Sequence, residues 1–180
     1  WFDIFSNPQH GTSEKPFDWW TGCFRDNIQR IGHTLLVLEW EDPKPLSSAW
    51  CTFEMASTLL GGGSTLEVVM NRAEEEHFTR SLVADFERVS VKTCAVDVEN
   101  GIRARDEDDL RKIREAIRDT IGFAQTTKLI IARMREWMVQ AGRDALARMA
   151  PDERGTSNVL VCTAHLELSQ SRYAEAEALY

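Results

Sequence analysis

The chain has 180 residues, of which 43% are hydrophobic and 28% are charged, and its formal net charge is -8. This length can bury one sizeable core, and the composition excludes disordered, fibrous and membrane-embedded classes. The surplus of carboxylates argues against a nucleic-acid partner, because phosphate binding needs a concentrated basic face. No apolar run approaches the roughly 20 residues that span a bilayer, and the first residues lack the pattern of a signal peptide. We therefore expect a soluble, cytoplasmic protein with neither nucleic acid nor a membrane as partner.

Cysteine and histidine spacing gives no sign of a metal site. The four cysteines form no C-x-x-C pair, and the four histidines are equally scattered: Cys23, Cys51, Cys94 and Cys162, with His10, His33, His77 and His165. Zinc sites and disulfide frameworks show closer, regular spacings. We expect reduced, mostly buried thiols and no metal.

The first hundred residues alternate between strand-like and helical patterns. The predicted strands cover residues 1–5, 34–38, 66–70 and 94–98, and the predicted helices cover 16–31, 48–60 and 74–89. Gly32 and the triple glycine at 61–63 are stop signals, and Ser47 or Ser48 can cap the second helix. This order predicts an α/β fold in which crossover helices join parallel strands.

The remaining residues are predicted to be helical. One helix begins at the acidic run 106–109 and is interrupted at Gly122, and a long helix then runs over 124–149 until Pro151. A further helix from Ser157 is followed by a turn at 169–171 and a second helix that opens at Arg172. We expect residues 101–150 to form a helical connector or the last helices of the domain.

The candidate site residues follow the predicted strands. In open α/β sheets, ligands bind beyond the carboxyl ends of the strands. Ser6 and Asn7 follow the first strand, Trp40 follows the second, and Trp50 and Glu54 share one face of the next helix. The tryptophans could stack on a flat ring or serve as packing anchors, and Glu54 could be a functional carboxylate or an ordinary helix carboxylate.

Several segments of this first part resemble successive parts of a TIR domain. The segments are Trp1-Phe2-Asp3, Phe24-Arg25-Asp26-Asn27-Ile28, Val37-Leu38 and, most specifically, Ser48-Ala49-Trp50-Cys51-Thr52-Phe53-Glu54. The resemblance implies a flavodoxin-like, TIR-like parallel sheet over residues 1–100, lacking the family's first strand and helix. It also matches Glu54 to the glutamate with which enzymatic TIR domains cleave NAD+ between nicotinamide and ribose. NAD+ would then be a substrate, and no cofactor is implied.

The last segment resembles the start of a tetratricopeptide repeat of the kinesin-light-chain-like kind. Leu160, Ala164 and Leu168 precede the run Arg172-Tyr173-Ala174-Glu175-Ala176-Glu177-Ala178-Leu179-Tyr180. The resemblance makes residues 157–180 an incomplete repeat and implies protein partners bound by a repeat array. Together, the two resemblances favour an intracellular signalling module that self-associates through its TIR-like domain. The alternative is an NAD+ hydrolase with Glu54 as catalytic carboxylate and Ser6, Asn7, Trp40 and Trp50 as pocket residues.

Overall fold

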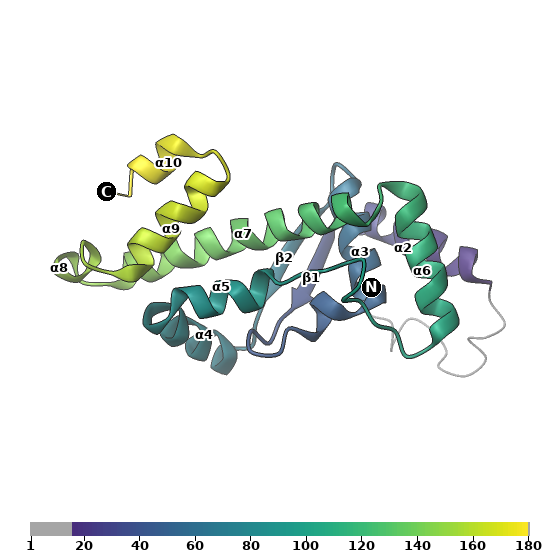
Figure 1. The fold of residues 1–180 in the computed structure, drawn as a ribbon, viewed down its shortest axis with the longest axis horizontal. Helices are drawn as coiled ribbons and strands as arrows, with labels where there is room; N and C mark the ends of the chain where they lie inside the picture. The colour runs from purple at the N-terminus through teal and green to yellow at the C-terminus, as the bar shows by residue number, and fades with distance from the viewer. Residues whose placement is uncertain (1–15, 180) are drawn as a thin grey trace.

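The computed structural model describes residues 16–179 and is mostly helical around a small parallel sheet (Figure 1). The elements are α2 Phe17–Ile31, β1 His33–Val37, η2 Lys44–Ser47, α3 Ala49–Leu60, β2 Thr65–Val69, α4 Arg72–Ala84, α5 Phe86–Cys94, α6 Glu107–Thr120, α7 Phe123–Arg148, α8 Pro151–Arg154, α9 Asn158–Ser169 and α10 Tyr173–Glu177. This architecture is compatible with the expected α/β class. The predicted strand 1–5, Ser6 and Asn7 lie outside the described residues.

The two strands confirm the predicted parallel arrangement. β1 pairs with β2 in parallel register from His33 opposite Thr65 to Val37 opposite Val69, and α3 forms the crossover between them. Each strand begins one residue earlier than predicted. Gly32 has φ 70°, which ends α2, and its carbonyl accepts a hydrogen bond of 2.9 Å from the Thr65 N–H. The left-handed glycine therefore turns the chain directly from helix into strand.

The start and end of α3 also match the sequence prediction. Ser48 is the N-cap, and its hydroxyl accepts a hydrogen bond from the Cys51 N–H. The helix ends at the triple glycine, where Gly62 adopts φ 62°. The segment from Ser48 to Glu54 therefore occupies the cap and the first two turns of a helix.

The segment after β2 differs from the sequence prediction. The single predicted helix 74–89 is two helices, because Asp85 ends α4 and caps α5 by accepting from the Arg88 N–H at 3.0 Å. The predicted strand 94–98 is wrong: α5 extends through Cys94, and no strand follows it. The side chains of Val96 and Val98 are each buried. The Val98 N–H donates to the Thr127 hydroxyl rather than to a neighbouring strand. Alternating burial in an irregular segment here imitates the period of a strand.

Two clusters of buried side chains form the core, and α7 contributes to both. The first lies between the sheet, α3, α6 and α7, and includes Ile113, Ile117, Ile130 and Met134. The second is formed mainly by α4, α5, α7 and α9. Trp137 of α7 packs against both clusters. The helices of residues 101–150 are thus part of the packed body that contains the sheet (Figure 1).

The last two helices match the predicted order of helix, turn and helix, and they form a hairpin that lies beside α7. α9 runs along the second half of α7, and α10 folds back on α9 after a turn at Ser171, whose φ is 60°. Gly142 of α7 faces Thr163 of α9 so closely that a Cβ at position 142 would overlap the Thr163 hydroxyl. Small residues at the contact therefore allow the helices to approach each other.

Candidate functional site

Trp50 is held in an aromatic cluster at the start of α3. Its ring lies 5.8 Å from that of Phe17 and 5.3 Å from that of Phe24, and it meets Phe53 edge-on. The indole Nε1 donates a hydrogen bond of 3.3 Å to Asp109 at the first turn of α6. Trp50 thus joins α2, α3 and α6, and its ring is half-buried.

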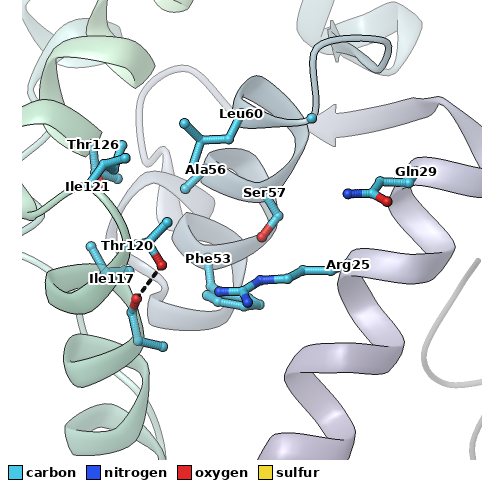
Figure 2. A pocket seen from close by; sticks show the side chains of 12 residues that line it. Arg25, Gln29, Phe53, Ala56, Ser57, Leu60, Ile117, Thr120, Ile121 and Thr126 are labelled. Carbon is cyan, nitrogen blue, oxygen red and sulfur yellow. Dashed lines mark hydrogen bonds between the residues drawn. The ribbon is translucent and has the colours of Figure 1, made fainter.

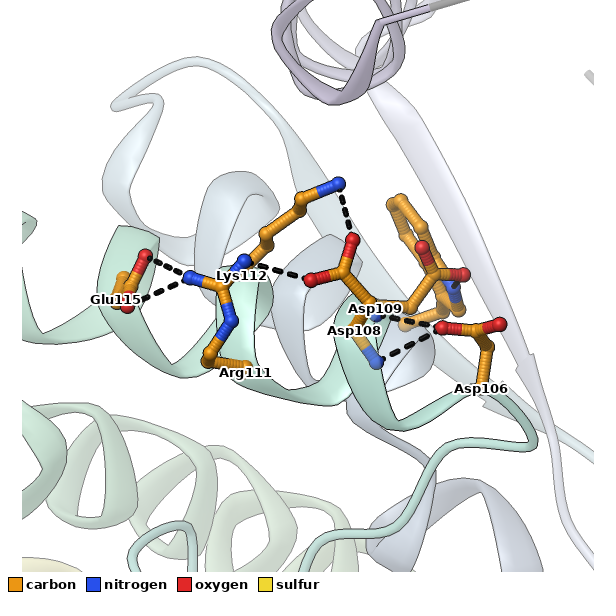
Figure 3. A network of polar contacts seen from close by, with 7 residues as sticks. Asp106, Asp108, Asp109, Arg111, Lys112 and Glu115 are labelled. Carbon is orange, nitrogen blue, oxygen red and sulfur yellow. Dashed lines mark hydrogen bonds and ion pairs between the residues drawn. The ribbon is translucent and has the colours of Figure 1, made fainter. Parts of the chain in front are cut away.

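A network of charged groups positions Asp109 (Figure 3). Asp106 caps α6 by accepting from the backbone N–H groups of residues 108 and 109. Asp108 forms ion pairs with Lys112 at 2.5 Å and with Arg111 at 2.6 Å, and these partners, Lys112 first, hold the pKa of its carboxyl below the usual value. Because these groups are exposed, the network orients side chains more than it stabilises the fold.

Trp40 lies at the carboxyl end of β1 but is completely buried. Its ring is 5.4 Å from that of His77 and 6.5 Å from that of Phe78, and the Arg88 guanidinium lies over it at 5.4 Å. Its backbone N–H donates to Glu74 at 2.9 Å, while its Nε1 has no hydrogen-bond partner within residues 16–179. Protein atoms cover both faces of this ring, as in a packing anchor.

Glu54 is half-buried in the second turn of α3. Its backbone carbonyl accepts a hydrogen bond of 2.8 Å from the Thr58 hydroxyl. Burial raises the pKa of the neighbouring Cys51 thiol, and the negative charge of Glu54 raises it further, against a hydrogen bond with Ser48 that lowers it. Cys51 is therefore held as a neutral thiol, which is a poor nucleophile.

The predicted site residues fall into separate regions of the structure. Trp50 and Glu54 share α3, next to the first core cluster, whereas Trp40 belongs to the second cluster. Ser6 and Asn7 lie outside the described residues. Of the three predicted site residues that the structure describes, it brings Trp50 and Glu54 together on one helix, through the spacing from which they were predicted, and places Trp40 elsewhere.

A groove of about 750 Å³ lies at the carboxyl end of β2. Its floor includes Val69 and Met70, and its wall includes Trp137, which stacks on Phe78 at 5.0 Å. Arg172 reaches this groove from the start of α10 and pairs with Glu136 at 3.2 Å. The rule on strand ends predicts this edge of the sheet, but sequence spacing cannot show that α7 and α10 line it.

A smaller hollow of about 150 Å³ lies between α2, α3 and α6 (Figure 2). Arg25 covers the Phe53 ring at 5.2 Å on one side, and Ile117 and Thr120 of α6 lie on the other. Of the predicted site residues that the structure describes, Trp40, Trp50 and Glu54, none lines this hollow or the larger groove. The smaller hollow was not predicted from the sequence.

The most unusual surface feature is on the sheet itself. Leu35 and Val37 of β1 are 57% and 65% exposed, although both belong to the continuous apolar run of this strand. Their neighbours Leu36 and Leu38 are buried. One face of β1 therefore presents two large apolar side chains to solvent, which marks it as a candidate interaction surface.

Comparisons with known proteins gave no family for the chain. No protein-family model, no curated protein and no solved structure matched it. Within residues 16–179, no group of three or more His, Cys, Asp or Glu side chains could hold a metal ion. None of the helices in that same range has the length and apolar character needed to cross a membrane.

Proposed function

We propose that this chain is an intracellular signalling module of the TIR-like kind, with a flavodoxin-like sheet that self-associates and a tetratricopeptide hairpin that recruits protein partners. The observation that carries the proposal is the open apolar face of β1, with Leu35 and Val37 more than half exposed. Strands with such a face are usually covered by another polypeptide. The parallel β1–α3–β2 order and the capped Ser48–Glu54 segment support the resemblance on which the proposal rests.

The C-terminal hairpin supports the second part of the proposal. α9 and α10 are antiparallel neighbours, and each carries a buried alanine, Ala164 and Ala176, of the small size that the close helix approach of a tetratricopeptide hairpin requires. Leu168 and Tyr173 remain 43% and 67% exposed beside the turn. In a repeat array, side chains of this kind are covered by an adjacent repeat or a bound partner.

Analytical ultracentrifugation of the whole chain tests the proposed self-association. We expect the weight-average sedimentation coefficient to rise with protein concentration and to reach that of a dimer or larger species. Far-ultraviolet circular dichroism at each end of the concentration range controls for unfolding. A folded protein that sediments as a monomer at every concentration would contradict the proposal.

The second candidate function is cleavage of NAD+. The Ser48 cap and the half-buried position of Glu54 favour it, because the capped segment Ser48–Glu54 is the part of the chain that resembles the TIR motif and it holds Glu54 in the second turn of α3. In this reaction the bond between ribose C1′ and nicotinamide breaks, and its electron pair leaves with nicotinamide. Water then bonds to C1′ and loses a proton. Glu54 would orient the ribose hydroxyls and stabilise the oxocarbenium-like charge.

Release of nicotinamide from NAD+ separates the two functions. For an enzyme, we expect release by the unchanged chain and its loss in Glu54→Gln, while Glu75→Gln, an exposed glutamate of α4, retains it. Circular dichroism confirms that both variants fold. Equal turnover in all three proteins would exclude Glu54 as the catalytic group, and absence of turnover in the unchanged chain would leave the interaction module.

A further inference from the structure

Among the described residues 16–179, no strand pairs with the outer edge of β1. In the parallel register, the backbone groups of residues 34, 36 and 38 point towards β2, as the bond from Leu38 N–H to Val69 C=O shows. Those of His33, Leu35 and Val37 therefore point to the opposite edge. In the part of the chain that the structure describes, the N–H and C=O groups of Leu35 and Val37 have no hydrogen-bond partner.

The two edges of the sheet differ in whether a side chain bonds to their backbone groups. On the outer edge of β2, Arg133 of α7 donates from Nε and Nη2 to the Leu66 carbonyl, at 2.8 and 2.5 Å. This side chain occupies a backbone acceptor that a further strand would need. Among residues 16–179, no side chain bonds to the outer edge of β1 in this way, and the strand carries no proline or lysine of the kind that normally blocks an edge. The sheet can therefore accept another strand on one side only.

Charges at the two ends of β1 favour one particular strand as partner. Arg30 lies in the last turn of α2, just before the strand, and Glu39 follows the strand. Both are exposed, and neither forms an ion pair with another residue of the range 16–179. An antiparallel copy of the same strand brings the basic end of each chain beside the acidic end of the other. A parallel copy would place like charges together.

We propose that β1 pairs antiparallel with β1 of a second copy, centred on Leu35, to form one continuous four-stranded sheet. The inference rests on the proposed self-association and assigns its surface. Leu35 then lies opposite Leu35 of the other copy, and His33 of each copy lies opposite Val37 of the other. All three of these residue pairs exchange both backbone hydrogen bonds. The four exposed Leu35 and Val37 side chains then form one apolar cross-strand cluster.

The surface area that this contact buries limits the affinity of the dimer. Two five-residue strands bury less surface than the roughly 1,200 Å² of a stable protein interface. We therefore expect a dimer that forms reversibly and dissociates on dilution.

The first test compares two lysine substitutions at valines of matched exposure. Val37→Lys places a charge in the proposed contact, whereas Val91→Lys makes the same change on α5, where the valine is 62% exposed. We expect Val37→Lys to raise the dimer dissociation constant about tenfold, since both copies lose apolar cross-strand contacts and gain a charge at the edge. Val91→Lys should keep the dissociation constant of the unchanged chain.

The second test determines the register with single cysteines. In the proposed pairing, the Cα atoms of the two Leu35 residues are about 5.5 Å apart, within disulfide range, whereas those of the two Val37 residues are roughly 14 Å apart. Under mild oxidation, Leu35→Cys should give a covalent dimer on a non-reducing gel. Val37→Cys and the unchanged chain, which carries the four native cysteines, should not.

The outcomes separate this inference from the proposed function. A monomer at every concentration would overturn both. Association that Val37→Lys and Val91→Lys affect equally, or cross-linking of Val37→Cys in place of Leu35→Cys, would overturn β1 pairing and leave self-association through another surface. Selective loss in Val37→Lys together with cross-linking of Leu35→Cys supports the antiparallel pair.

Discussion

The side chain of Glu167 is the one charged group that the described structure buries completely. Arg143 of α7 donates to one of its oxygens, and Arg172 lies 3.7 Å from the other. Arg172 also pairs with Glu136, so a chain of alternating charges joins α7, α9 and the start of α10. Removing one partner of a buried pair leaves the other charges without compensation.

Replacement of Glu167 by alanine should destabilise the protein. We expect Glu167→Ala to lower the free energy of unfolding by about 1–3 kcal/mol, at the low end for a buried ion pair because both arginines are partly open to water. Urea denaturation followed by circular dichroism measures the change. Glu177→Ala, at an exposed position of α10, is the control and should change stability by less than about 0.5 kcal/mol. Equal stability of the two variants would show that the buried pair contributes nothing.

At the level of secondary-structure elements, the contact between α7 and α9 depends on the absence of a side chain at position 142. Gly142 is buried against Thr163, and a methyl group there would overlap the threonine hydroxyl. Gly22 of α2 is a helical glycine with no atom within 4 Å of the place that its Cβ would occupy. The two glycines therefore predict opposite responses to the same substitution.

Gly142→Ala should destabilise the protein, and Gly22→Ala should stabilise it. We expect a loss of about 1–3 kcal/mol for Gly142→Ala from overpacking, and a gain of roughly 0.5–1 kcal/mol for Gly22→Ala from helix propensity. Thermal and urea unfolding of both variants measure these changes. A stabilising Gly142→Ala would mean that α7 and α9 can separate at no cost.

The sequence predicts most helices and both described strands because their signals are local. Ser48 caps α3 as expected, the acidic run at 106–109 lies at the start of α6, and Gly32 ends α2. The errors occur where burial is set by distant residues. Val96 and Val98 alternate like a strand because both are buried in the first core cluster on either side of the exposed Asp97, and the break at Asp85 depends on a cap within an otherwise continuous helical pattern.

The candidate site was less predictable than the fold, for a physical reason. Helical spacing reliably places Trp50 and Glu54 on one helix, but no sequence period shows that Trp40 becomes enclosed by α4 and α5. The exposure of Leu35 and Val37 was also not predicted. Their continuous apolar run indicates a strand buried on both faces, and only the tertiary structure shows that one face is open.

Considered as a whole, the molecule is organised along α7. This helix has 26 residues, so it is about 39 Å long, and it carries side chains of both core clusters. Trp137, Met70 and Cys94 pack against both clusters. A body joined by shared side chains and one uninterrupted helix should unfold as a unit.

We therefore expect one cooperative unfolding transition for the whole chain. Far-ultraviolet circular dichroism reports mainly the helices, and tryptophan fluorescence reports the surroundings of the chain's six tryptophans, which include Trp40, Trp50 and Trp137 of the core clusters. The two urea curves should coincide in midpoint and slope. A fluorescence transition that precedes the loss of helix would show that the sheet region and the α9–α10 hairpin separate into independent units.

Arg133 has a consequence for the number of copies that can assemble. A sheet with two open edges can add copies without limit, and the product is a fibre. Here the guanidinium on the Leu66 carbonyl closes one edge, so growth through the other edge must stop after a single addition. The same arginine that binds α7 to the sheet would therefore prevent a further copy from adding at β2. Its side chain would keep the assembly a finite complex rather than an insoluble polymer.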